Sequence, residues 1–308
     1  MKIGFLSNQL DNRGTGNALF NYAYFNNTIL GNDSAIFTYV ASIHNEEAFK
    51  NFSRVFGGVN IVTGPQDIKD VDALYHIKSG EYDGFDYDGN YLVHAVFNAN
   101  TPHGTRFASI SKWMGSRFNV PYVPHMVNLP DVPDTLRAGL KIPETALVFG
   151  RYGGRDTFDI PWAWEAINRA MEVIPDAYFL FMNTEEPNVE LADPSRVFFL
   201  GPTVNPYYKR VFINTCDAMI HARQRGETFG IAVGEFSICA KPVFTYSQSP
   251  EKAHIEELGE WGIYYEDEES LFAQLISFYK DAEQPPLYTQ YTPELVMEQF
   301  KEVFLDGL

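Results

Sequence analysis

The sequence is poor in cysteine and in basic residues, and it contains no long hydrophobic run. Its only cysteines, Cys216 and Cys239, are too few for a disulfide framework or a four-cysteine zinc site. The 23 Lys and Arg residues stand against 40 Asp and Glu residues, and this net charge of −17 argues against binding to nucleic acid or to anionic lipid. No apolar run approaches the ~20 residues that span a bilayer. Ser7 and Asn8 interrupt the first apolar stretch too early for a signal-peptide core. We therefore expect a cytoplasmic protein without stable membrane insertion.

The order of the sequence patterns predicts an α/β protein with two domains. A chain of 308 residues is long enough for about two domains at roughly 100 to 200 residues each. Short β-rich runs alternate with helical stretches, which is typical of βαβ units and parallel sheets. Three prolines interrupt this alternation within residues 128–143, after which it restarts. We expect one α/β domain over residues 1–135, a second over 136–290, and a C-terminal helix over 291–308.

The segment 218–246 carries the most chemical information. It predicts a strand, a polar loop with Glu227, a helix with Glu235, and a second strand. Eight helical positions separate the two carboxylates by roughly 12 Å, too far for a shared metal ion or an acid/base pair. The intervening N–H groups at the helix N-terminus attract phosphate. A nucleotide sugar has hydroxyls at both ends, on its sugar and its ribose, and a diphosphate between them. Two carboxylates on either side of a phosphate-binding helix N-terminus would suit such a molecule. In the alternative interpretation, Glu227 only caps the helix and Glu235 lies in solvent.

This segment resembles the Glu-x7-Glu motif of glycosyltransferase family 4. That family consists of retaining enzymes with the GT-B fold, in which two Rossmann-like domains face across a cleft and a C-terminal helix crosses back to the first domain. The resemblance implies that Glu227 binds the donor sugar and acts in catalysis, while Glu235 binds the ribose. It also implies that Thr228, Phe229 and Gly230 offer backbone donors to the sugar or phosphate.

Two arginines upstream extend the resemblance. The run LVFGRYGGRDTFD is similar to the first strand of the family's second domain, which ends in Gly-Arg and is followed by Lys. Arg151 matches the family's Arg, and Arg155 takes the place of the Lys, so both are expected to neutralise diphosphate oxygens. For Arg155 a position on a surface loop is the open alternative. Residues 238–241 depart from the family, which has small residues and Gly before Pro-Val.

The first half resembles the family more diffusely. Gly14-Thr15-Gly16-Asn17 is similar to the Gly-rich loop near the donor phosphates, with Gly16 as the expected contact. His94 lies near the end of an apolar strand, where family members place a functional histidine near the reacting sugar. A satisfied core histidine is the alternative for His94, and His103 competes for its role. His125 stands where relatives often carry Pro-Asn-Gly, and no role follows for it.

The resemblance implies a reaction as well as a fold. We expect a retaining glycosyltransferase that moves a sugar from a UDP or GDP sugar to an acceptor hydroxyl of a glycan or glycoprotein. No cofactor and no metal ion are expected, because the sequence contains no Asp-rich metal motif of suitable spacing. The open alternatives are a sugar-nucleotide epimerase, a sugar phosphorylase, and a non-catalytic module that binds nucleotide sugars.

Overall fold

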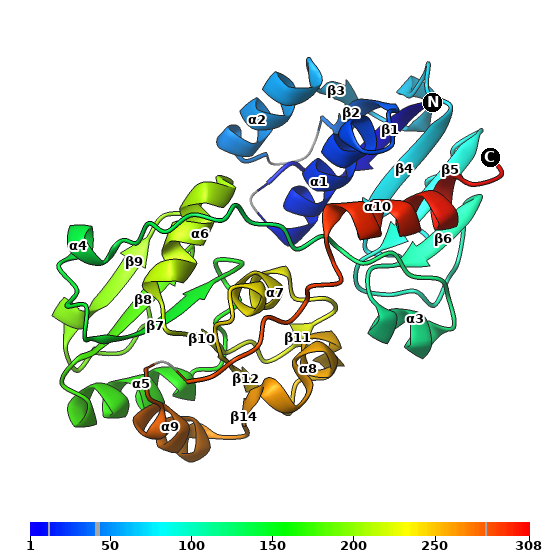
Figure 1. Cartoon of the computed structure of the whole chain (residues 1–308). Helices are drawn as coiled ribbons and strands as arrows, with labels where there is room; N and C mark the ends of the chain where they lie inside the picture. Colours follow the sequence, from blue (N-terminus) through cyan, green and yellow to red (C-terminus); the bar gives the residue numbers. More distant parts are fainter. Residues whose placement is uncertain (12, 41–43, 281) are drawn as a thin grey trace. The chain divides into compact units, whose positions relative to one another are not determined.

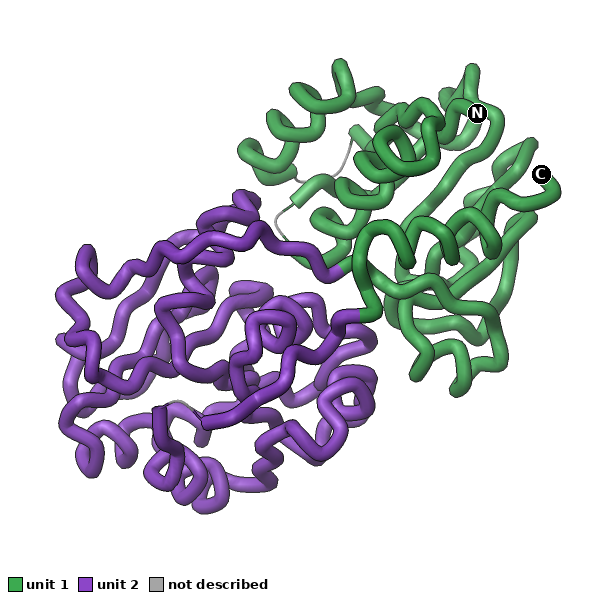
Figure 2. Tube along the Cα trace, viewed as in Figure 1, with its two compact units in different colours: residues 1–126, 290–308 green, residues 127–289 purple. Residues whose placement is uncertain are grey.

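The computed structural model describes residues 1–11, 13–40, 44–280 and 282–308. The chain divides into two compact units: residues 1–126 and 290–308 form unit 1, and residues 127–289 form unit 2 (Figure 2). The first boundary therefore falls after Met126 rather than after residue 135. The intervening residues belong to unit 2 because they are hydrogen-bonded to it. The side-chain amide of Asn214 donates to the backbone oxygen of Val132 at 2.6 Å, and the Leu136 amide donates to the Thr215 hydroxyl at 2.8 Å.

Unit 1 contains a six-stranded sheet in the order β3-β2-β1-β4-β5-β6, and every pairing in it is parallel. Helices α1, α2 and α3 follow β1, β2 and β6 (Figure 1). The strands are β1 (Lys2–Ser7), β2 (Asp33–Tyr39), β3 (Asn60–Val62), β4 (Ala73–Lys78), β5 (Asn90–Ala95) and β6 (Arg106–Ser109). The helices are α1 (Gly14–Thr28), α2 (Glu46–Phe56) and α3 (Lys112–Phe118).

Unit 2 repeats this winding in a second parallel sheet, ordered β14-β12-β10-β7-β8-β9. Aromatic and aliphatic side chains of β7, β8 and α5 fill its core. The strands are β7 (Leu147–Tyr152), β8 (Ala177–Met182), β9 (Val197–Leu200), β10 (Ala218–His221), β12 (Val243–Tyr246) and β14 (Ile263–Tyr265), and β11 (Gly226–Glu227) pairs separately with β13 (Glu251–Lys252). The helices are α4 (Arg137–Leu140), α5 (Trp162–Val173), α6 (Pro206–Thr215), α7 (Ile231–Ile238), α8 (Ala253–Leu258) and α9 (Glu268–Ser277).

Both sheets have the doubly wound order in which the direction of strand addition reverses once. The reversal lies between β1 and β4 in unit 1 and between β7 and β10 in unit 2. Ligands of such sheets bind outside the carboxyl ends of the strands at this point. The predicted α/β fold with two Rossmann-like domains is confirmed, and the topology selects one edge of each sheet for a site.

Helix termini follow local sequence signals. The side chain of Asn205 accepts a hydrogen bond from the Tyr207 amide at the start of α6, and Thr292 accepts one from the Leu295 amide at the start of α10. The first helix differs from the expectation, because α1 begins at Gly14 and includes Gly16 in its first turn. The glycine-rich run is therefore the start of a helix rather than a loop before one.

The C-terminal segment returns to unit 1. Helix α10 (Pro293–Phe300) continues into a π-helical turn over Lys301–Leu305 (Figure 1). The ring of Phe300 stacks on Tyr22 with centroids 5.3 Å apart, and the ring of Phe304 meets His94 at 5.4 Å. This aromatic packing explains why the amphipathic end of the sequence completes the core of unit 1.

Candidate functional site

The strand reversal of unit 2 brings together the residues that the Glu-x7-Glu segment supplies. Strand β10 ends at His221, beside β7, and the following loop carries Arg223 and Glu227 (Figure 1). Helix α7 starts a few residues later and carries Glu235. The segment is thus a strand, loop and helix at the carboxyl edge of a parallel sheet, as the sequence predicted.

The carboxylate of Glu227 is held by two nitrogen donors. Arg223 Nη1 donates to its Oε2 at 2.7 Å, and His221 Nε2 lies 3.2 Å from its Oε1. These contacts outweigh the burial that opposes ionisation and lower the pKa of Glu227 to about 2. The side chain remains 21% exposed, so an ionised and oriented hydrogen-bond acceptor faces solvent at the edge of the sheet.

The Thr245 hydroxyl and the ring of His254 hold the ring of His221 in place. Its Nδ1 lies 2.8 Å from the Thr245 hydroxyl, and the same hydroxyl lies 3.0 Å from Nε2 of His254. The two imidazole centroids are 4.8 Å apart. Burial lowers the pKa of His254 to about 3, so this ring is neutral at pH 7. The chain from Glu227 to His254 is therefore a connected polar network within the core of unit 2.

Glycine is required at two positions of the motif. Gly230 has φ of +89°, in the left-handed region, and precedes the first residue of α7. A Cβ at Gly234 would lie 2.7 Å from the ring of Tyr288, so only glycine allows this approach to α7. The N-cap residue of α7 is Gly230, which offers no side chain for a cap. The Glu227 carboxylate is hydrogen-bonded to Arg223 and lies beside His221, and these contacts speak against the capping role offered as the alternative.

Glu235 lies inside the protein rather than in solvent. Its side chain is 7% exposed, and its Oε1 lies 3.4 Å from the ammonium of Lys209 on α6. Among the described residues, its Oε2 has no hydrogen-bond partner although it is buried. Burial raises the pKa of Glu235 and lowers that of Lys209, because it disfavours both charges. The side chain is therefore buried, and the solvated alternative is wrong.

Arg151 is committed to the protein itself. Its Nη1 donates to Thr184 Oγ1 at 2.5 Å, and its Nη2 donates to Gly154 O at 2.8 Å and Thr157 Oγ1 at 2.6 Å. The side chain is buried, which lowers its pKa to about 10 against the opposing charge of Glu227. Arg151 therefore holds the loop after β7 in shape. These contacts speak against the expected role of Arg151 in binding the diphosphate.

Arg155 lies in the same loop with a different environment. Its side chain is 73% exposed and forms one ion pair with Glu185 at 3.3 Å. An exposed pair of this kind contributes about 0 to 1 kcal/mol and exchanges easily with other anions. Arg155 therefore lies on a surface loop, as the alternative interpretation held. Its role in binding a diphosphate stays a prediction.

Gly16 and His103 of unit 1 have close contacts with neighbouring parts of the chain. A Cβ at Gly16 would lie 2.3 Å from the backbone oxygen of Asp11, so close packing of the chain by itself requires this glycine. His103 is partly buried, its Nδ1 lies 2.7 Å from Thr101 O, and it lines a separate cavity of about 220 Å³ beside Tyr91.

His94 occupies the core of unit 1. It is fully buried, its Nδ1 lies 2.6 Å from the Tyr75 hydroxyl, and its Nε2 lies 2.9 Å from Val123 O and 3.2 Å from Ser109 O. Burial lowers its pKa to about 4. This is the satisfied core histidine that the sequence offered as the alternative, and it speaks against the catalytic role expected of His94.

Sequence reasoning missed His221, Arg223, His254 and Lys209. The first two lie within the segment that was singled out, and their position at the end of a predicted strand was an available signal. His254 and Lys209 reach the site from α8 and α6, and nothing local in the sequence indicates that contact. Within the described residues, no group of three or more His, Cys, Asp or Glu side chains is arranged to hold a metal ion.

The comparisons with known proteins concern the fold. The sequence matches no protein-family model and no curated protein. The structure is similar to that of Anabaena Alr3699/HepE in complex with UDP and glucose, with a TM-score of 0.69, 13% identity, and coverage of 99% of this chain and 95% of that one. It is also similar to WaaG, a glycosyltransferase of lipopolysaccharide biosynthesis, with a TM-score of 0.62, 12% identity and coverage of 89% of both chains.

A third similarity is to a putative UDP-N-acetylglucosamine 2-epimerase from Listeria monocytogenes. Its TM-score is 0.61 at 10% identity, covering 99% of this chain and 96% of that one. At these identities the comparisons establish the shared GT-B fold. No helix in the described part of the chain is long and apolar enough to cross a membrane.

Proposed function

We propose that this protein is a retaining glycosyltransferase that uses a nucleoside diphosphate sugar as donor. The observation that carries the proposal is the placement of Glu227, Gly230 and Glu235 around the start of α7, at the strand reversal of unit 2. The shared fold of a chain in complex with UDP and glucose supports the same donor class and favours UDP over GDP.

Each group of the site has a role in this proposal. The ionised carboxylate of Glu227 accepts hydrogen bonds from hydroxyls of the donor sugar, in an orientation that Arg223 and His221 impose. The buried Oε2 of Glu235 accepts from the ribose. The backbone of Thr228, Phe229 and Gly230 and the exposed Arg155 stabilise the diphosphate.

The central physical problem of the reaction is charge separation. The anomeric carbon becomes cationic as the diphosphate leaves, so the N-terminus of α7 and the positive charge of Arg155 would lower the barrier by stabilising the departing diphosphate. Retention follows if the acceptor attacks on the face from which the diphosphate departs, which is a proposal taken from the family resemblance. The net charge of −17 favours a neutral glycan or glycoprotein acceptor over a polyanionic one.

The donor site is tested by thermal shift with UDP, GDP and ADP. UDP is expected to raise the melting temperature, because a ligand that binds only the folded state stabilises it by mass action. If none of the three nucleotides has an effect, the donor site is wrongly assigned.

The reaction is tested with Glu227→Gln, which keeps the size of the side chain and removes its charge. We expect sugar transfer from UDP-glucose to fall about a hundredfold or more, as when a transition-state contact is lost, while the Kd for UDP stays nearly unchanged. Glu172→Gln, at an exposed position of α5, is the matched control. Equal activity in both variants would remove Glu227 from the mechanism. Turnover is expected to persist in EDTA.

An epimerase is the second candidate, and the similarity to the Listeria protein favours it. An epimerase would convert the sugar nucleotide without any acceptor, whereas a glycosyltransferase releases UDP at a substantial rate only when an acceptor is present. A phosphorylase would require inorganic phosphate, and a binding module would show no turnover. Incubation of UDP-sugars with and without an acceptor mixture separates these cases.

A further inference from the structure

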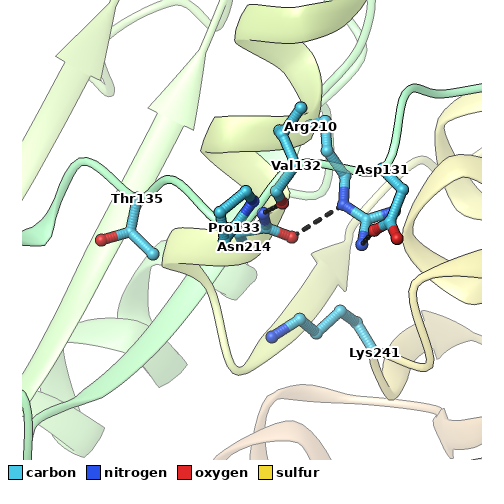
Figure 3. Close-up of a pocket in the computed structure, with 7 residues that line it drawn as sticks. All are labelled: Asp131, Val132, Pro133, Thr135, Arg210, Asn214 and Lys241. Atoms are coloured by element: carbon cyan, nitrogen blue, oxygen red, sulfur yellow. Dashed lines mark hydrogen bonds and ion pairs between the residues drawn. The ribbon is translucent and has the colours of Figure 1, made fainter.

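Unit 2 contains a cavity of about 420 Å³. Its lining shares no residue with the Glu227 cluster, which comprises Glu227, His221, Arg223 and His254. Its walls come from the segment after residue 130, from the second half of α6, and from the turn after α7. The lining residues are Asp131, Val132, Pro133, Thr135, Arg210, Asn214 and Lys241 (Figure 3).

The walls of this cavity are held in place by α6. The Asn214 amide donates to Val132 O at 2.6 Å and to Asp134 O at 3.2 Å, and Tyr207 donates from its hydroxyl to the Asp134 carboxylate at 3.0 Å. Arg210 Nε donates to Asn214 Oδ1 at 2.8 Å, which fixes the guanidinium beside the amide (Figure 3). A site that is rigid before binding loses less entropy when a ligand arrives.

The charge of the cavity is positive on a strongly negative protein. Arg210 and Lys241 supply two cations, and Asp131 is the single acidic residue of the lining. Arg210 Nη2 donates to Asp131 Oδ1 at 3.1 Å, but the Asp131 side chain is 96% exposed, so solvent screens this pair. For the Lys241 ammonium, the described chain offers no hydrogen bond and no ion pair. In Figure 3 its side chain projects into the space beneath Arg210 and Asn214.

Both cations act electrostatically on the Cys239 thiol. Burial raises its pKa, the charges of Arg210 and Lys241 lower it, and those of Glu235 and Asp131 raise it. A guanidinium fixed at one side and a mobile ammonium at the other match the oxygens of a phosphate, which the guanidinium binds with paired hydrogen bonds and the ammonium as a point charge.

We propose that the cavity between residues 131–135, α6 and Lys241 binds a small phosphate-bearing molecule, at a site separate from the Glu227 cluster. Its volume falls in the range of small-molecule sites, which is roughly 300 to 1,000 Å³. Arg210 and Lys241 bind the phosphate of this ligand. This proposal does not depend on the glycosyltransferase assignment.

The test measures binding of inorganic phosphate and of glucose 6-phosphate by calorimetry, in the presence of saturating UDP and against sodium chloride of equal ionic strength. UDP keeps phosphate from the proposed diphosphate position. We expect saturable binding that Lys241→Met weakens about tenfold or more, because a charge-assisted contact is removed while the apolar stem stays. Arg210→Lys keeps the charge but loses the paired geometry and is expected to weaken binding less than Lys241→Met.

The control is Lys301→Met, which removes the same charge from an exposed position of unit 1. Unchanged melting temperatures without phosphate verify that each variant folds. Equal weakening in the Lys241 and Lys301 variants, or the absence of saturable binding to the wild type, overturns the proposal. UDP binding by the Lys241 variant is recorded in parallel, so that failure of this site and failure of the donor site give different results.

Discussion

The ammonium of Lys209 lies 3.4 Å from Oε1 of Glu235, and both side chains are at least nine-tenths buried, at 10% and 7% exposure. The ring of Tyr152 lies 5.7 Å from the same ammonium. Two opposite charges buried together stabilise one another, and each is costly without its partner. This pair joins α6 to the motif helix α7, so it links the candidate site to the stability of unit 2.

Replacement of Lys209 by methionine is expected to destabilise the protein by about 1 to 3 kcal/mol at pH 7, because the buried carboxyl of Glu235 loses the partner of its Oε1. Urea unfolding measures the change. Lys50→Met breaks the Lys50–Glu46 pair, whose side chains are 72% and 82% exposed, and is expected to change stability by less than about 0.5 kcal/mol. If both variants lost a similar amount of unfolding free energy, the buried pair would contribute no more to stability than the exposed pair.

Ala240 provides a prediction in the stabilising direction. Its φ is +54°, in the left-handed region, within residues 238–241, where the sequence departs from the resembled family. Ala240→Gly is expected to stabilise the protein by about 1 kcal/mol, because the strain of Cβ in this conformation exceeds the entropy that glycine adds to the unfolded chain. Ala273→Gly, at an exposed helical position of α9, is expected to cost about 1 kcal/mol in the same thermal or urea assay. The changes in unfolding free energy of the two variants should therefore have opposite signs. A loss of stability in both would contradict the prediction.

The buried His94 predicts a loss of stability at mildly acid pH. Its folded pKa is lowered from 6.5 to about 4, so the unfolded chain takes up a proton first as the pH falls. The contribution is complete above pH 6.5 and is lost between pH 6.5 and about 4, to a total of about 3 kcal/mol.

The His94→Gln variant lacks this contribution. It is expected to be less stable at pH 7, and its stability should fall less steeply than that of the wild type between pH 6.5 and 4. Its Kd for UDP should stay unchanged, because the residue lies in the core of unit 1. A strong loss of sugar transfer without a loss of stability would restore the catalytic role first expected of His94.

The contribution of Glu227 to the free energy of unfolding also decreases as the pH falls, but in a lower pH range than that of His94. The pKa of Glu227 is lowered from 4.5 to about 2 in the folded protein, so its stabilising contribution is complete above pH 4.5 and disappears as the pH falls toward 2. The difference in unfolding free energy between the wild type and Glu227→Gln should shrink over this window by up to about 3 kcal/mol. A constant difference from pH 5 to 2 would mean that Arg223 and His221 do not hold the carboxylate ionised.

Local signals in the sequence account for much of the fold. Runs such as 2–7, 177–182 and 243–246 match the observed strands, because a continuous apolar run between polar turns has one suitable place, the interior of a parallel sheet. The N-caps at Asn205 and Thr292 depend on residues three positions apart or fewer, so the local sequence encodes them. Helix α2 has the same kind of local signal, because the side chain of Asn45 accepts a hydrogen bond from the Ala48 amide.

The sequence by itself determined the α/β class, the division into two units and the segment that holds Glu227 and Glu235, because these follow from alternation, spacing and a motif within 29 contiguous residues. Only the tertiary structure decided which side chains meet. It paired Glu235 with Lys209, enclosed His94 between Tyr75 and Val123, and turned Arg151 into its own loop. Each of these contacts joins separate elements of the chain, so no local pattern encodes it. Burial and hydrogen bonding there depend on how the elements pack.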